Sequence, residues 1–172
     1  GSAGGITVFV TSSFDGTLDT PEEADAAQPQ QTLLPDQDVD KSSWQALDAK
    51  SPLRLEMPSS WVAGSVYDEY RAYALKDTKD RQSAAAAVVA RMPSGGYWSI
   101  QAMRWLSPPA IENPSGRETI NGTEYLLFHQ GKHIRMVAWK RNNTLYWVLN
   151  TLRNELSNDT MMGLAQSFKP VQ

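Results

Sequence analysis

The sequence lacks cysteine altogether and contains only two histidines. Without cysteine the chain can form neither disulfides nor thiolate metal sites, and it has no cysteine nucleophile. Its apolar runs are all shorter than the roughly 18 residues that a membrane-spanning helix requires, and no secretory signal is visible. These absences argue against several enzyme classes and predict no membrane span within these residues. Residues 1–5 read as a linker, so we expect any membrane anchor to lie upstream.

Positive charge is absent from residues 1–40, which carry eight acidic groups. The rest of the chain carries eleven acidic and sixteen basic groups, so a segment of formal charge −8 precedes one of +5. The basic excess favours an anionic polymer as partner; ordinary solvated charge is the alternative, because Lys and Arg are scattered singly. Nucleic acid is not expected as a partner, since none of the usual recognition motifs occurs.

Two segments of different character divide the chain. Residues 1–40 join a strand-like stretch at 6–11 to an acidic, proline-punctuated remainder, which predicts a flexible linker. Within it, Leu33–Leu34 is expected to lie along the domain. Residues 41–172 alternate strand-like runs with turn residues and predict a single domain.

The predicted fold class of this domain is α+β, with a predominantly antiparallel sheet of about six or seven strands. A short N-terminal helix, capped by Ser42 or Ser43, and an amphipathic C-terminal helix, capped by Ser157 or Asn158, complete the prediction. The C-terminal helix is expected to pack on the sheet through one apolar stripe, formed by Met161, Leu164, Ala165 and Phe168. Strands are predicted at residues 53–57, 67–75, 83–91, 97–105, 125–130, 133–140 and 145–150.

The least certain element is the alanine-rich segment at residues 83–91. Alanine favours helix, but the segment is short, ends in Val-Val-Ala-Arg and lies between two strand-like runs. We therefore predict a strand, with helix as the alternative. The strongest turn signal is Asn121–Gly122, a dipeptide typical of tight hairpins.

No catalytic constellation is evident. His129 and His133 are four residues apart, but they flank a predicted hairpin turn and lack the intervening Glu of a zinc helix. No Gly-x-Ser-x-Gly elbow and no phosphate-cradling glycine loop occurs. The sequence therefore predicts neither enzyme activity nor a cofactor or metal.

Aromatic residues are the better candidates for a functional site. The chain contains six Trp and six Tyr, and many of them fall on predicted strands. The simpler interpretation is core packing. The alternative is a platform that stacks against sugar rings, because adjacent strand residues point to opposite faces. On this alternative, the candidate ligand or partner surface consists of Trp98, Trp105, Arg135 and Trp139.

A family resemblance adds a functional expectation. Residues 146–165, ending in the run Met-Met-Gly-Leu-Ala, resemble the C-terminal accessory region of actinobacterial LytR–CpsA–Psr family cell-envelope proteins. The similarity covers most of residues 6–170. Two departures are Asp159, where relatives tend to carry Glu, and His129, where they tend to carry an aromatic residue. Besides residues 146–165, the segments that carry the resemblance are 6–11 with 14–18, 70–77, 97–101 with 105–109, and 133–139.

The resemblance implies an extracytoplasmic, membrane-anchored protein. In that family an upstream catalytic domain transfers glycopolymers from a polyprenyl-phosphate carrier to the cell wall, and none of its catalytic positions falls in this chain. The chain would then be a non-catalytic module with three classes of partner: its own upstream domain, anionic wall glycan, or the polyprenyl carrier. The alternative hypothesis is a stand-alone secreted or lipoprotein-type domain that binds a protein or small ligand.

Overall fold

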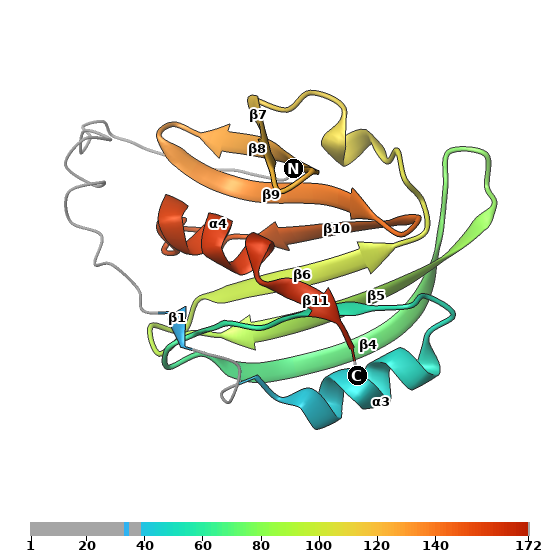
Figure 1. Ribbon diagram of the computed structural model, residues 1–172, viewed down its shortest axis with the longest axis horizontal. Coiled ribbons are helices and arrows are strands. Elements are labelled where there is room, and N and C mark those ends of the chain that lie inside the picture. Colours follow the sequence, from blue (N-terminus) through green and yellow to red (C-terminus); the bar gives the residue numbers. More distant parts are fainter. Residues whose placement is uncertain (1–32, 35–38, 172) are drawn as a thin grey trace.

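The computed structural model describes residues 33–34 and 39–171 (Figure 1). The predicted strand at residues 6–11 and most of the predicted linker lie outside the described residues. The predicted α+β fold is confirmed: a seven-stranded antiparallel sheet carries two α-helices, one near each terminus of the domain. No helix in the described part of the chain is both long and apolar enough to cross a membrane.

The main sheet is built from two blocks that meet at its centre. Its strand order is β4-β5-β6-β10-β9-β8-β7, and every neighbouring pair is antiparallel. The chain makes the β4–β6 block first, crosses to the far edge, and returns strand by strand until β10 pairs with β6. The bounds are β4 (Val66–Lys76), β5 (Gln82–Arg91), β6 (Tyr97–Met103), β7 (Gly116–Ile120), β8 (Thr123–Gln130), β9 (His133–Arg141) and β10 (Thr144–Leu149).

The alanine-rich segment forms strand β5, which confirms the strand prediction. It pairs along its length with β4 on one side and β6 on the other. Ala85 and Ala86 point to opposite faces and belong to the two different hydrophobic clusters of the domain. Ladder hydrogen bonds and burial on both faces therefore outweigh the helix propensity of alanine, which is a weak preference per residue.

The hairpin turns follow the predicted chemistry. Asn121 and Gly122 both adopt left-handed backbone angles, with φ of 50° and 82°, between β7 and β8. Asn142 and Asn143, with φ of 51° and 60°, make the corresponding turn between β9 and β10. Asn and Gly tolerate this region best, which explains why these residues stand at the turns.

Helix α3 (Lys41–Lys50) is capped by Asp40 rather than by the predicted Ser42 or Ser43. The Asp40 carboxylate accepts hydrogen bonds from the Ser43 backbone N–H at 3.1 Å and from the hydroxyls of Ser42 at 2.9 Å and Ser43 at 2.7 Å. A carboxylate has two oxygens and can satisfy all three donors, whereas a serine hydroxyl at the cap cannot. Trp44 and Leu47, three residues apart on the helix, are its buried residues.

Replacing Asp40 with alanine should lower the free energy of unfolding by about 1 kcal/mol, the usual effect of losing a helix N-cap. Hydrogen bonding, chiefly from the Ser43 hydroxyl, holds the pKa of Asp40 below its ordinary value of 3.8. Because the folded-state pKa is depressed, this stabilisation is present above the unfolded-state pKa and is lost as the pH falls through and below 3.8. Urea unfolding at neutral and acidic pH checks this prediction. The difference in free energy of unfolding between the wild type and Asp40→Ala should be smaller at acidic pH. A difference independent of pH would contradict it.

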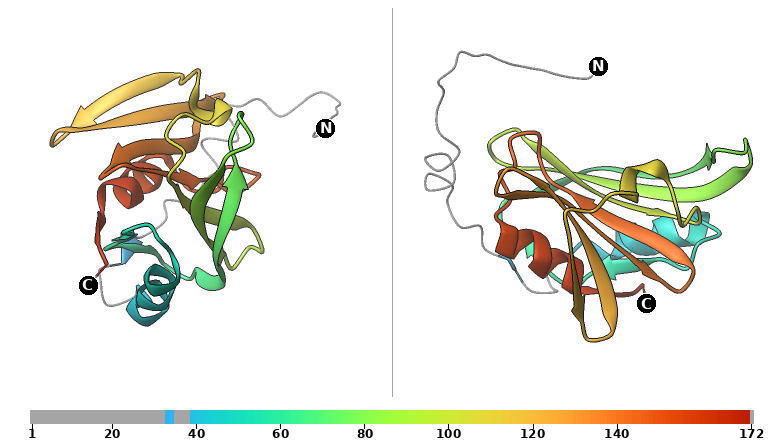
Figure 2. Two further views of the ribbon diagram at one scale, coloured as in Figure 1. Left: turned by 90° about the vertical axis from the view of Figure 1, so that its right-hand side faces the viewer. Right: turned by 90° about the horizontal axis from the view of Figure 1, so that it is seen from above.

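One face of the sheet is covered by the helices and by short strand pairs, and Figure 2 shows α3 and α4 on the same side. Ser157 caps α4, as one of the two predicted alternatives, and Met161, Leu164 and Ala165 are buried. The helix ends before Phe168, which is buried in the following strand. The covering elements are α4 (Asn158–Gln166), β1 (Leu33–Leu34) paired with β3 (Trp61–Val62), and β2 (Glu56–Pro58) paired with β11 (Phe168–Pro170).

Leu33–Leu34 does lie along the domain, as predicted. β1 contacts α4 beside Gly163, where an added side chain would collide with Leu33. The predicted strand at residues 53–57 is shorter than expected and shifted to β2. The backbone N–H groups of Leu53 and Leu55 donate to the side chains of Ser51 and Asp48, so they are not available to a strand ladder.

The other face of the sheet carries a second, smaller hydrophobic cluster. The connection between β6 and β7 crosses it and contributes Ile111 from the 3-10 helix η2 (Pro109–Ile111), with Trp105 and Leu106 packed alongside. This cover is shorter than the helical layer on the opposite face. Side chains at the β5–β6 turn end of the sheet, such as Tyr97, consequently remain exposed.

Candidate functional site

Two of the four predicted surface residues are core residues. Trp98 is 1% exposed and donates its indole N–H to the Ser65 hydroxyl at 3.0 Å. Trp139 is fully buried and stacks on Tyr146 with ring centroids 5.6 Å apart. The packing interpretation therefore holds for both, and burial removes them from any ligand-facing surface.

The other two predicted residues lie apart from each other. Trp105 is half-buried against the second hydrophobic cluster. Arg135 is half-buried, which lowers the pKa of its guanidinium, and it donates to the backbone carbonyls of Asn150 and Thr151. Arg135 thus braces the loop after β10. The structure does not gather the four residues on one surface.

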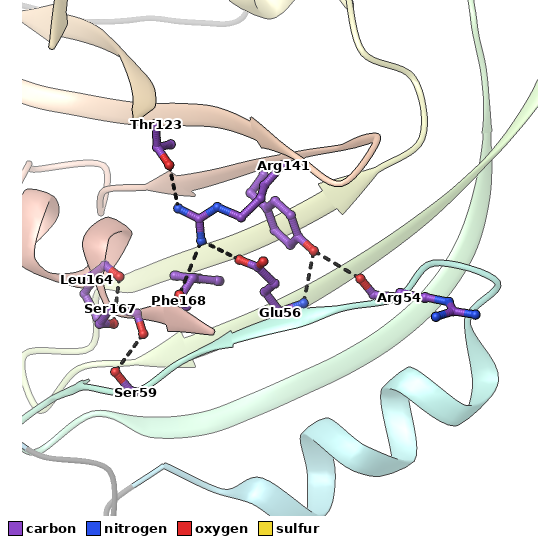
Figure 3. Close-up of polar contacts among 9 residues, drawn as sticks. Arg54, Glu56, Ser59, Thr123, Arg141, Leu164, Ser167 and Phe168 are labelled. Atoms are coloured by element: carbon purple, nitrogen blue, oxygen red, sulfur yellow. Dashed lines mark hydrogen bonds and ion pairs between the residues drawn. The ribbon is translucent and has the colours of Figure 1, made fainter. Parts of the chain in front are cut away.

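A buried ion pair lies between the sheet and its cover (Figure 3). Arg141, the last residue of β9, donates from Nη1 to Glu56 of β2 at 2.7 Å. The side chain of Glu56 is 4% exposed and that of Arg141 is 27% exposed. The Arg141 guanidinium also donates to the Thr123 hydroxyl at 2.9 Å and to the Phe168 carbonyl at 3.4 Å. One side chain therefore ties β9 to β2, β8 and β11.

The tyrosine beside this pair completes the polar cluster. The Glu56 backbone N–H donates to the Tyr146 hydroxyl at 3.0 Å, and that hydroxyl lies 3.4 Å from the Arg54 carbonyl, to which it donates. Burial raises the pKa of Tyr146 to about 12, so the hydroxyl keeps its proton at neutral pH. Both charges of the ion pair are engaged by each other, and the cluster is a structural anchor.

A surface hollow of about 830 Å³ adjoins this anchor and is the candidate site. It lies where the end of α3, the start of β2, the β9–β10 turn and the end of β11 meet. Its charged side chains are Arg54, Arg104, Asp48 and Glu56. The remaining lining residues are Pro52, Leu55, Asn142, Asn143, Pro170 and Val171.

The carboxylates of the hollow are already paired, whereas its arginines form no ion pair with a carboxylate among the described residues. Asp48 accepts from the Leu55 backbone N–H at 2.8 Å, and Glu56 is paired with Arg141. Arg54 and Arg104 are exposed, and the Arg104 guanidinium donates to the Pro52 carbonyl at 3.3 Å. Figure 3 shows the Arg54 side chain extending away from the ion pair. Because neither guanidinium has an anionic partner in the part of the chain that the structure describes, both can receive an anion.

This arrangement suits a phosphate or carboxylate group. Guanidinium groups bind such anions through paired, charge-assisted hydrogen bonds. The exposed amide side chains of Asn142 and Asn143, presented by their tight turn, add further donors beside the arginines.

Sequence reasoning missed Arg54 and Arg104 because the two are fifty positions apart and neither belongs to a basic run. The fold joins them: Arg54 precedes β2, and Arg104 follows the last residue of β6. The histidines lie on β8 and β9, with His129 opposite Ile134 and His133 opposite Gln130 across the hairpin. Among the residues that the structure describes, no group of three or more His, Asp or Glu side chains is placed to hold a metal ion.

Comparison with known proteins adds no relative. No family model, no curated protein and no solved structure matches the chain.

Proposed function

We propose that this chain is a non-catalytic, extracytoplasmic module of a cell-wall glycopolymer transferase, and that it binds an anionic group of the polymer or of its polyprenyl carrier. The hollow with Arg54 and Arg104 carries the proposal, because two guanidinium groups line one cavity and, among residues 33–34 and 39–171, neither is paired with a carboxylate. The formal charge of +5 on residues 41–172 supports it, since a positive domain attracts anionic polymer.

The family resemblance supplies the biological setting of this proposal. A transferase of that kind would act outside the membrane, be held there by an upstream anchor, and carry its catalytic domain ahead of this module. The module's partners would be that domain and the anionic chain on which it acts. Its role would be to hold the polymer or carrier while the chemistry takes place elsewhere.

A titration followed by two-dimensional ¹H–¹⁵N NMR tests the binding. Inorganic pyrophosphate serves as the probe for the carrier head group, and poly(glycerol phosphate) as the probe for an anionic wall polymer. Saturable shifts are expected for the amides of Arg54, Arg104, Asn142 and Asn143. Arg54→Gln and Arg104→Gln should each weaken binding about tenfold, the effect of losing one charge-assisted hydrogen bond.

Arg117→Gln is the matched control, because it removes the same charge from an exposed position on edge strand β7, where Arg117 pairs with Glu124 at 3.4 Å. It should leave affinity for both probes unchanged. If all three variants weakened binding equally, attraction would be a property of net charge and the hollow would not be the site. If neither probe shifted any amide, the binding proposal would fail.

A further inference from the structure

Exposed apolar side chains are concentrated at one end of the sheet. Among the described residues, the large hydrophobic side chains that stand out are Val66 at 47% exposed, Tyr97 at 50% and Leu152 at 87%. Arg91 of β5 lies opposite Val66 of β4 on one side and opposite Tyr97 of β6 on the other. The side chains of Val66, Arg91 and Tyr97 therefore lie on the same face of the sheet. Tyr97 and Leu152 line the same hollow. The exposed ring of Tyr97 and the exposed Leu152 side chain therefore offer an apolar contact surface within one hollow.

Leu152 is exposed on a loop that is firmly held. The buried side chain of Asn150 donates to the carbonyls of Ile134 at 3.0 Å and Leu156 at 2.9 Å. Its oxygen accepts from the backbone N–H groups of Thr151 at 2.8 Å and Leu156 at 3.0 Å. Arg135 donates to the carbonyls of Asn150 and Thr151. The loop is therefore pre-organised, which lowers the ordering cost of binding.

The hollow between this loop and the β5–β6 turn has a volume of about 270 Å³. Its apolar wall consists of Tyr97 and Leu152, and its polar groups come from Arg153, Glu155 and Ser94. The Ser94 hydroxyl donates to Glu155 at 2.5 Å, and an added side chain at Gly96 would collide with the Glu155 carboxylate. The absence of a side chain at Gly96 leaves room for the Glu155 carboxylate in its observed position.

This lining matches a pyranose ring better than other occupants. A pyranose has an apolar C–H face that packs on an aromatic ring, and hydroxyls at its rim that bond to carboxylate and guanidinium groups. The volume of about 270 Å³ lies just below the range of about 300–1,000 Å³ of drug-sized pockets, which suits a single sugar ring. The hollow combines one positive group, Arg153, with one negative group, Glu155, so it offers an anionic lipid head group no net charge attraction. A stable protein interface needs about 800 Å² per partner, more than three side chains supply.

We propose that Tyr97, Leu152, Arg153 and Glu155 form a saccharide-binding site in which a pyranose ring packs on Tyr97. The site is distinct from the arginine hollow: Tyr97 begins β6 and Arg104 follows its last residue, so the two sites lie at opposite ends of that strand, about 20 Å apart at the usual rise per residue. Uncharged saccharide is the expected ligand here, and binding does not require the arginines of the first hollow.

Titration of the whole chain with the tetramers of β-1,4-linked N-acetylglucosamine and glucose tests this site. We expect saturable shifts at Gly95, Gly96, Tyr97 and Leu152 with at least one of the two probes. Tyr97→Ala should weaken binding about tenfold, the upper range for loss of an aromatic contact, whereas Tyr97→Phe should retain it. The indole N–H resonance of the buried Trp98 reports that each variant is folded.

The double variant Arg54→Gln, Arg104→Gln separates this site from the first one and should bind the saccharide normally. Loss of saccharide binding in that variant would overturn the assignment to Tyr97. Equal affinity in Tyr97→Ala and the wild type would overturn it as well, as would the absence of a saturable response to both tetramers. Binding to phosphatidylglycerol vesicles that Leu152→Ala abolishes, with no saccharide response, would assign the surface to a membrane instead.

Discussion

Arg141→Met should lower the free energy of unfolding by about 3 kcal/mol, the lower end of the range for breaking a buried ion pair. The variant leaves the carboxylate of Glu56, 4% exposed, without its cation. It also removes the hydrogen bonds to the Thr123 hydroxyl and the Phe168 carbonyl, which help hold β11 against the sheet. Because Arg141 itself is 27% exposed, water can partly solvate the abandoned carboxylate, so the upper end of the range is not expected. Urea unfolding followed by tryptophan fluorescence measures the change.

A double-mutant cycle with Glu56→Met completes this experiment. Removing both charges takes away the desolvation penalty of the pair, so the double variant should be more stable than Arg141→Met alone. If the stability losses of Arg141→Met and Glu56→Met summed to the loss of the double variant, the two charges would not interact. A loss below about 1 kcal/mol for Arg141→Met, the value of an exposed pair, would contradict the buried arrangement.

Asn150→Ala is expected to lower the free energy of unfolding by about 3 kcal/mol, as much as Arg141→Met. Its amide makes four hydrogen bonds, and truncation would leave buried backbone donors and acceptors unpaired, each costing about 1–3 kcal/mol when no water replaces the partner. Entry of water into the space left by the side chain keeps the total below the sum. Chemical denaturation gives the global loss, and amide hydrogen exchange should show faster opening at Thr151 and Leu156.

Asn113→Ala is the control for this second prediction, because Asn113 is an exposed asparagine in a connecting segment. It should change stability by no more than about 0.5 kcal/mol. Equal effects of the two substitutions would show that the hydrogen bonds of Asn150 do not hold the loop. Loss of saccharide binding in Asn150→Ala at temperatures where it remains folded would further link loop rigidity to the Tyr97 site.

The sequence predicts helices, strands and turns well where a few neighbouring residues determine them. The left-handed turn at Asn121–Gly122, the Ser157 cap and the buried stripe on α4 all depend on a few neighbouring residues. The predicted cap of α3, Ser42 or Ser43, is wrong, because Asp40 stands close to both serines and all three are good capping residues. The fold decides for Asp40, whose carboxylate also accepts from Tyr70 of β4 at 3.2 Å.

The sites could not be predicted in the same way, because they depend on the order of strands. Aromatic residues on strands cannot be assigned to one face of the sheet or the other until the register is known. The sequence therefore predicts Trp98 and Trp139 as surface residues although both are buried. Tyr97, the neighbour of Trp98, points the other way and is half exposed. Arg54 and Arg104 converge only because β2 and the end of β6 meet beside the β9–β10 turn.

The two edges of the sheet have a consequence for self-association. An edge strand offers unpaired backbone groups to a second copy, which is a route to aggregation. β4 carries exposed charges at Asp68, Glu69 and Arg71, and a register shift between Tyr67 and Glu69 interrupts its ladder. β7, at the other edge, is five residues long and exposes Arg117 and Glu118. At both edges of the sheet that the described residues form, these charges disfavour pairing with a strand of a second copy and so disfavour growth into fibrils.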